Sequence, residues 1–175
     1  ISAPQPVEQK LSASHDRIAA AMRIAPDDIS RMHRIACINA GLSTLIVPVD
    51  TLNTLLAIHP DQQHLKEFCL VNGIEIIVVF STETSLPGNR YRTRVFAPIF
   101  GYLEDPATGS GNAALGYYLL KEGSWDGRMI AIEQGKSREY PNIIRIVSDE
   151  SKVQHSVFFG GNAVVRIEGE YLIYP

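Results

Sequence analysis

The chain has only two cysteines, no long apolar run and little excess charge, and each of these absences narrows the class of protein. Cys37 and Cys69 lie far apart, without the spacing of a disulfide framework, so we expect two buried thiols in a reduced, cytoplasmic protein. No apolar run approaches the roughly 18 residues of a transmembrane helix, and the start at Ile1 does not resemble a secretory leader. A net charge of -3, with scattered basic residues, gives no reason to expect nucleic acid or a membrane as a partner.

The histidines do not form a metal-binding pattern. The one close pair, His59 and His64, lies five residues apart across Pro60, whereas two ligands on one helical face would be four apart. We therefore predict no metal site. The remaining histidines are isolated in the sequence and are His15, His33 and His155.

The most informative stretch is EDPATGSGN, residues 104–112, which places two carboxylates and several small polar residues before an expected helix. Pro106 fixes its own φ and biases Asp105 away from helical geometry, so Asp105 should stand in an extended or turning segment. Thr108 is a suitable N-cap, and the residues after it predict a helix over 109–121.

Two glycines give this helix start a chemical use. Gly109 and Gly111 carry no side chain beyond hydrogen, so a ligand can approach the N–H groups of the first turn. The helix dipole favours negative charge there, and contributes about 0.3 to 2 kcal/mol to holding an anion. The stretch therefore predicts a place for a carboxylate or an oxyanion.

Four other interpretations of the stretch were open on the residues alone. Gly109, Gly111 and Ala114 fit a dinucleotide fingerprint, but a loop from 97 to 107 separates them from the preceding strand. No Gly-Lys-Ser or Gly-Lys-Thr of a phosphate-binding loop follows. Thr108-Gly109-Ser110 resembles the aspartic protease tripeptide, but Asp105 stands three residues too early. A capped helix whose small residues serve only close packing is the purely structural alternative.

Hydrophobic periodicity predicts a mixed α and β fold. The residues from 74 to 80 are almost wholly apolar and indicate a central strand buried on both faces. Strands on both sides of the helix at 109–121 suit a sheet wrapped around it. The other expected helices cover 12–25, 51–57 and 61–71, and the other expected strands cover 35–38, 43–49, 91–97, 129–134, 143–147, 153–159, 163–168 and 171–174.

Several motifs together resemble the PhzF-like isomerase family of phenazine biosynthesis. They are Arg94-Val95-Phe96-Ala97-Pro98, then Gly101, then EDPATGSGNAALGYYL, with Glu133-Gln134-Gly135 similar to the family's EQG element and residues 159–165 and 168–170 similar to its closing strands. The resemblance implies the α+β class: half of a diaminopimelate epimerase-like fold, a barrel-like mixed sheet around a central helix. It divides the chain into a connecting arm and first helix over 1–34 and a C-terminal family domain over 35–175.

The resemblance also implies an incomplete site. Family members resemble two similar halves closing on one cleft, with a catalytic glutamate in the N-terminal half, and nothing in this chain matches that half. We expect the C-terminal half of a cofactor-independent isomerase or epimerase, completed by an N-terminal half from the same precursor or a separate chain. Its substrate would be a small carboxylate-bearing metabolite, and a homodimer is plausible. A non-catalytic ligand-binding or assembly module with the same fold is the alternative.

Site roles follow from the same resemblance. Asp105 and Ser110 are the catalytic candidates, which would bind polar groups of the substrate and help to move a proton. Glu104 is expected to be structural and to pair with a neighbouring helix or strand. The expected substrate-binding residues are Thr108, Gly109, Ser110, Gly111 and Asn112.

Two differences from related sequences restrict the reaction and the substrate that can be assigned. The helix entry has no cysteine, which disfavours the two-thiol racemisation expected of diaminopimelate epimerases and proline racemases. After EQG the family commonly shows Gly-Arg-Pro-Ser, where this chain has Glu139-Tyr140-Pro141-Asn142. A contact made by the family's arginine is therefore lost or replaced by Arg138, and the phenazine precursor is not a safe substrate to assign.

Overall fold

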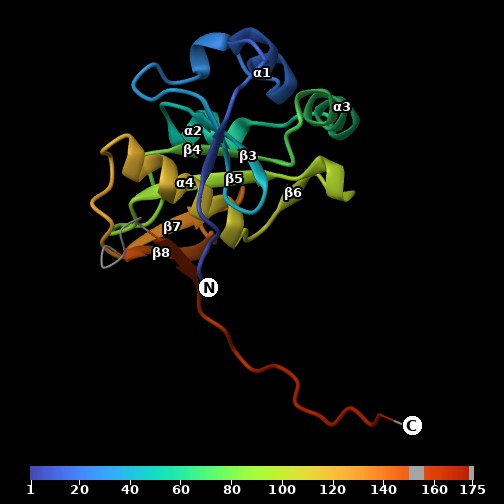
Figure 1. The fold of residues 1–175 in the computed structure, drawn as a ribbon, viewed down its shortest axis with the longest axis vertical. Helices are drawn as coiled ribbons and strands as arrows, with labels where there is room; N and C mark the ends of the chain where they lie inside the picture. The colour runs from blue at the N-terminus through green and yellow to red at the C-terminus, as the bar shows by residue number, and fades with distance from the viewer. Residues whose placement is uncertain (150–155, 174–175) are drawn as a thin grey trace.

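One curled sheet surrounds a single helix, α4 (Gly109–Lys121), in this computed structural model (Figure 1). The structure describes residues 1–149 and 156–173 of the 175. The other helices are α1 (His15–Met22), α2 (Leu52–Ala57) and α3 (Gln62–Asn72), with short 3-10 turns at Pro26–Asp28 and Pro98–Phe100. The strands are β1 (Val7–Gln9), β2 (Ala36–Asn39), β3 (Ser43–Pro48), β4 (Ile76–Ser81), β5 (Tyr91–Phe96), β6 (Glu104–Asp105), β7 (Ile130–Gln134), β8 (Asn142–Asp149) and β9 (Ser156–Gly160).

The sheet is mixed and closes on itself. Its strands follow the order β1-β2-β3-β4-β5-β7-β8-β9, with β6 added to β5. The β3–β4 and β5–β7 pairs are parallel and the other pairs are antiparallel. At the closure, Ser2 bridges Phe158, and the Ala3 N–H donates to the Val157 carbonyl at 2.9 Å. The first residues of the chain therefore cover the edge that β9 would otherwise expose.

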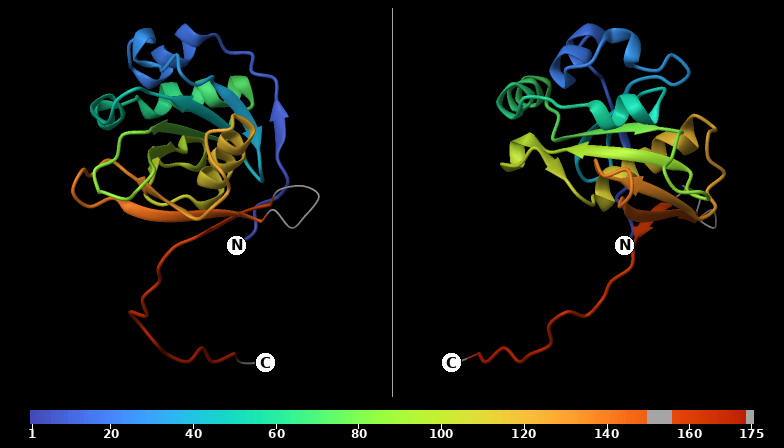
Figure 2. Two further views of the ribbon diagram at one scale, coloured as in Figure 1. Left: turned by 90° about the vertical axis from the view of Figure 1, so that its left-hand side faces the viewer. Right: turned by 180° about the vertical axis from the view of Figure 1, so that it is seen from behind.

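Strand β4 separates two hydrophobic cores. Ile76, Val78 and Phe80 belong to the core around α4, whereas Ile77 and Val79 belong to the core beneath α1, α2 and α3. Because successive side chains of a strand point to opposite faces, this alternation explains why the sequence of β4 is apolar throughout. The three outer helices gather on one side of the barrel, opposite β7 and β8 (Figure 2).

Helix α4 fits inside the sheet because it presents glycines where the strands approach. A Cβ at Gly111 would lie 3.1 Å from a methyl of Val78, and a Cβ at Gly116 would lie 3.1 Å from atoms of Ile146 and Val157. These contacts are tighter than packed side chains normally allow, so larger residues here would force the helix away from the sheet. At both positions glycine therefore serves the close packing of α4 against the sheet.

The fold class is confirmed: an α+β domain with a barrel-like mixed sheet around a central helix. The outer helices α1 and α3 have side-chain caps. Ser14 and Asp61 accept hydrogen bonds from the first turns of α1 and α3, and Gly73 ends α3 in the left-handed conformation. Thr108 precedes α4 as expected but makes no side-chain capping bond.

The strands expected at 163–168 and 171–173 were wrong. Residues 161–173 run away from the barrel without pairing (Figure 1). A strand requires a partner for its backbone groups, and the described chain offers this segment none. The expected strand residues 153–155 and Tyr174 lie outside the described residues. Conversely, the structure has a strand that the sequence did not predict: β1 lies within the arm expected over 1–34.

Both cysteines are buried, as expected, and neither thiol should react in the native protein. Cys69 is fully buried, which raises the pKa of its thiol to about 12, and burial also raises the pKa of Cys37. The thiolate is the reactive species, so both groups are protonated and shielded near neutral pH. With Ellman's reagent we expect no rapid release of thionitrobenzoate from the folded chain. Both thiols should react once the chain is unfolded in 6 M guanidinium. One equivalent released quickly under native conditions would contradict this assignment.

Candidate active site

The EDPATGSGN stretch lies where β6 leads into α4. Asp105 is extended, as expected, and pairs with Val95 in the β5–β6 ladder. Its carboxylate is half-buried, and Oδ1 accepts a hydrogen bond from the Ala107 N–H at 3.2 Å. The carboxylate is therefore oriented by the turn that carries it.

The first turn of α4 offers donors to a ligand. The N–H groups of Gly109, Ser110 and Gly111 have no acceptor within the described residues, because a helix leaves its first amides unpaired. The half-buried Ser110 hydroxyl likewise has no hydrogen-bond partner in the described part of the chain. Unpaired amides at a helix start can hold an anion.

The other polar candidates face inwards. Thr108 and Asn112 are buried, and the Asn112 amide donates to the Thr108 carbonyl at 2.8 Å and to Gln134 Oε1 at 2.7 Å. The hydroxyl of Thr93 donates to Asn112 Oδ1 at 3.2 Å. These contacts occupy the side-chain amide of Asn112, so it holds the helix start in place and presents no polar atom to solvent.

Glu104 is structural, as expected. Its two oxygens accept from Arg94 Nε at 2.9 Å and Arg94 Nη2 at 2.8 Å, a bidentate pair between β6 and β5. Arg94 Nη1 also donates to the Ile58 carbonyl, which ties the end of α2 to the same pair. Glu104 is therefore committed to the scaffold.

Two hollows flank the turn at Pro106 and Ala107. One, of about 300 Å³, has Lys136 and Tyr140 on its wall, and the other, of about 520 Å³, has Phe159. Asn142 lines both, and its amide donates to the Pro106 carbonyl at 2.8 Å. The turn that carries Asp105 is thus open to a ligand on either side.

Phe159 covers part of the helix start. A Cβ built on Gly109 would lie 2.1 Å from the Phe159 ring, so only glycine allows the ring to rest there. The space that a side chain at residue 109 would need is therefore filled by this ring.

A buried ion pair supports the neighbouring loop. Arg92 and Glu133 are both fully buried and meet at 2.8 Å. Arg92 Nη2 also donates to the carbonyls of Gly135 and Ser137 at 2.6 Å. Burial by itself raises the pKa of Glu133, but hydrogen bonds from Asn89, the Ser85 and Leu86 amides and Arg92 outweigh it and hold that pKa below its usual value. The pair fixes the backbone of the loop that lines the smaller hollow.

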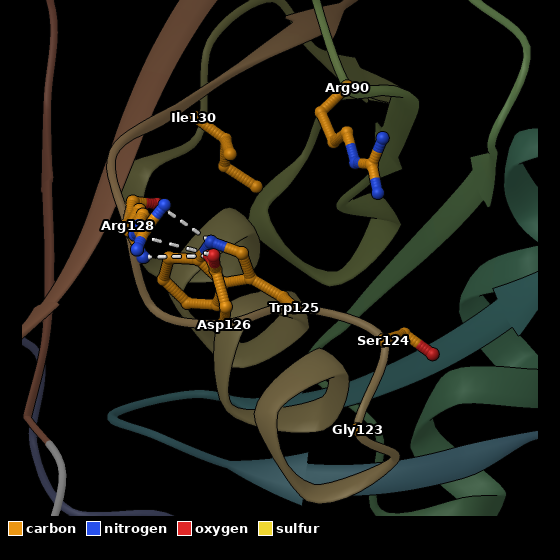
Figure 3. Close-up of a pocket in the computed structure, with 7 residues that line it drawn as sticks. All are labelled: Arg90, Gly123, Ser124, Trp125, Asp126, Arg128 and Ile130. Carbon is orange, nitrogen blue, oxygen red and sulfur yellow. Dashed lines mark hydrogen bonds and ion pairs between the residues drawn. The ribbon is translucent and has the colours of Figure 1, made fainter.

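A third hollow, of about 470 Å³, lies beyond the other end of α4 (Figure 3). Trp125 Nε1 donates to the Arg128 carbonyl at 2.7 Å, and Asp126 lies 3.6 Å from the Arg128 guanidinium. Since α4 has 13 residues, about 20 Å of helix separates this hollow from Asp105. It is not part of the candidate site.

No group of three potential His, Cys, Asp or Glu ligands gathers within residues 1–149 and 156–173. Over the same ranges, no helix is long and apolar enough to cross a bilayer.

Comparison with known families settles the relationship. The family model for phenazine biosynthesis-like proteins (PhzC-PhzF) matches residues 1–169. The chain belongs to this family.

Curated relatives of this family member include several named isomerases. An uncharacterized isomerase of Clostridium acetobutylicum is 27% identical over 168 residues, which cover 90% of this chain and 54% of the relative. One from Mesorhizobium japonicum is 30% identical, with coverages of 97% and 58%. The trans-2,3-dihydro-3-hydroxyanthranilate isomerase of Pseudomonas chlororaphis is 32% identical over 105 residues, 59% of this chain and 35% of that enzyme. The chain spans about half the length of the first two relatives.

Solved structures agree on the fold. A PhzF family protein of Bacillus anthracis superposes with a TM-score of 0.79 at 19% identity, covering 90% of this chain and 55% of that one. A predicted epimerase of Pseudomonas aeruginosa gives 0.71 at 21% identity, with coverages of 90% and 52%. At these identities the likeness concerns the fold alone.

Some site residues of this PhzF-like chain carried no signal of their own in the sequence. Gln134 stood out only through the family's EQG element, and Phe159 only through the closing strands. Lys136 and Tyr140 come from a loop far from the EDPATGSGN stretch in sequence, and only the sheet brings them together with it. Arg138, considered as a replacement for the family's arginine, donates instead to Asn53 Oδ1 at 2.6 Å.

Proposed function

We propose that this chain provides one wall of the active site of a cofactor-independent isomerase or epimerase, which moves a proton on a small carboxylate-bearing metabolite. The observation that carries the proposal is that one short segment, from the end of β6 to the first turn of α4, carries the Asp105 carboxylate, the unpaired amides of residues 109–111 and the Ser110 hydroxyl. The isomerase names of the curated relatives support the reaction class.

Each group has a chemical task in this proposal. The substrate carboxylate lies on the amides of residues 109–111, where the helix dipole stabilises it. Ser110 binds a polar group next to the reacting carbon. Asp105 donates or accepts the proton, and general acid–base catalysis of this kind typically contributes about 10²- to 10⁴-fold to the rate. Thr108 and Asn112 hold the helix start, since their side chains are buried, and Gly111 offers only its amide, because its Cα packs against Val78.

The opposite wall and a catalytic glutamate come from a second half-domain in this proposal, the N-terminal half of the family, in the same precursor or as a separate chain. The coverage of only about half of each relative supports a partner of similar size. Residues 161–173 also expose several large apolar side chains that such a partner could bury, namely Val164, Val165, Ile167, Tyr171, Leu172 and Ile173. A homodimer and a cytoplasmic location remain predictions, the latter from free cysteines.

Proton exchange from deuterated water tests the proposal. The chain is incubated with and without an N-terminal half-domain from the family, together with a panel of small amino and hydroxy acids, and deuterium at carbon is followed by NMR and mass spectrometry. We expect incorporation only when both halves are present. The matched control Arg128→Ala, at the distant end of α4, should leave the rate unchanged.

Two other results would redirect the assignment. Saturable binding of a carboxylic acid with no exchange, even with both halves present, would favour the non-catalytic binding or assembly module. Intact mass and co-purification of the natural protein would identify the second half-domain, either as a longer precursor or as a separate polypeptide.

A further inference from the structure

We propose that Gln134 is the positioning residue of this site: its side-chain amide fixes the backbone on both sides of the turn and so sets where the Asp105 carboxylate stands relative to α4. Gln134 is fully buried at the end of β7. The role in catalysis rests on the proposed function, whereas the positioning itself does not.

The hydrogen bonds of Gln134 span the turn. Nε2 donates to the Asp105 carbonyl at 2.7 Å and to Thr108 Oγ1 at 3.1 Å. Oε1 accepts from the Thr108 N–H at 3.0 Å and from Asn112 Nδ2 at 2.7 Å. A carboxamide has two N–H donors and two acceptor lone pairs, so all four are used. Gln134 therefore joins the residue before Pro106 to the residue that precedes α4.

The network leaves the amide only one orientation. The Thr108 N–H can only donate and the Asp105 carbonyl can only accept. If the Gln134 amide were turned by 180°, its NH₂ would face the Thr108 N–H and its oxygen would face the Asp105 carbonyl oxygen. Asn112 is held in the same way, since its amide nitrogen faces the Thr108 carbonyl. Fully satisfied networks of this kind, away from water, define a single geometry.

The other side-chain bonds to the turn are exposed. Pro106 has no N–H, the Ala107 N–H donates to Asp105 Oδ1, and the exposed Asn142 amide donates to the Pro106 carbonyl at 2.8 Å. Without Gln134, the Asp105 carbonyl and the Thr108 N–H would lose their buried partners, and the turn could move relative to the first amides of α4. A displacement of about 1 Å at a catalytic group can cost about 10²-fold in rate.

The first test uses the unmodified chain and needs no substrate. The side-chain NH₂ protons of Gln134 should exchange with D₂O at least about tenfold more slowly than those of Gln62, which makes one exposed hydrogen bond to the Gly101 carbonyl. Equal exchange rates for the two side chains would overturn the proposed geometry.

The second test uses Gln134→Met, which keeps the length of the side chain and removes its hydrogen bonds, with Gln62→Met as the matched control. We expect the protection of the Thr108 amide against exchange to fall about tenfold in Gln134→Met only. In the deuterium assay kcat should fall about 10- to 100-fold with KM within about threefold, because the amides that hold the carboxylate remain. Unchanged Thr108 protection, or a loss confined to KM, would contradict the positioning role.

The two proposals can fail separately. If no acid is exchanged by the wild-type halves, the amide measurements still decide the role of Gln134. If exchange is observed but Gln134→Met retains full kcat and Thr108 protection, the positioning role fails and the proposed function stands.

Discussion

Asp105→Asn is expected to reduce deuterium exchange by about 10²- to 10⁴-fold while the protein remains folded. Asparagine has nearly the same shape and keeps an oxygen for the Ala107 N–H, which Asp105 Oδ1 accepts at 3.2 Å. The backbone carbonyl held by Gln134 is also unchanged. The substitution removes the negative charge and, with it, the capacity to take up and release a proton. The rate is measured with the second half-domain present, and the fold is checked by circular dichroism.

Asp126→Asn is the matched control for this substitution. Asp126 Oδ1 accepts from the Arg128 N–H two residues on at 3.1 Å, the same local arrangement as Asp105 and Ala107, but at the distant end of α4. We expect its exchange rate to equal that of the wild type. An Asp105→Asn variant that retains the wild-type rate would refute the proton-transfer role.

Glu133→Gln is expected to destabilise the domain by about 3–5 kcal/mol, because it leaves the buried Arg92 guanidinium without its counter-charge. Glu133 also accepts from the Ser85 and Leu86 amides and from Asn89, and glutamine keeps only one acceptor oxygen, so part of the anchor of the loop before β5 is lost as well. A chain of this size loses about 2–4 °C of Tm per kcal/mol, so Tm should fall by about 6–20 °C. Urea unfolding and calorimetry measure the loss.

An exposed pair provides the control for the buried one. Asp27 and Arg31 lie 2.7 Å apart on the surface, and Asp27→Asn should cost at most about 1 kcal/mol. Equal costs for the two variants would show that the buried pair adds nothing special. Since the pKa of Glu133 is lowered by folding, its contribution is complete above the unfolded carboxyl value of about 4.3 and is lost as pH falls through the lower folded value. The stability gap between wild type and Glu133→Gln should narrow in that acidic range.

Helices and strands whose formation depends on neighbouring residues could be predicted from the sequence. The apolar run of β4 and the helix expected over 61–71 both depend on residues close together in the sequence, and each was found where the sequence indicated. The closure of the sheet was not predictable, because Ser2 meets Phe158 across nearly the whole chain. The tail beyond residue 160 shows the converse, since a strand-like sequence does not pair when no partner strand lies beside it.

In the candidate site, too, some features could be predicted from neighbouring residues and others could not. The helix start at 109 and the extended Asp105 followed from Pro106 and Thr108, which act on their neighbours. The inward orientation of Thr108 and Asn112 did not, because it depends on Gln134 from a strand more than 20 residues away. Polar residues in a motif can serve the ligand or the scaffold, and only the packed structure distinguishes the two uses.

The loop after β7 combines a buried, fixed backbone with exposed side chains. Buried Arg92 fixes its backbone through the carbonyls of Gly135 and Ser137, whereas the side chains of Lys136 and Tyr140 stand exposed on the wall of the hollow. Substitutions at these exposed positions change the shape and charge of the hollow without disturbing the buried bonds beneath them. If the hollow receives a substrate, as the proposed function requires, its specificity can change through this loop at little cost in stability.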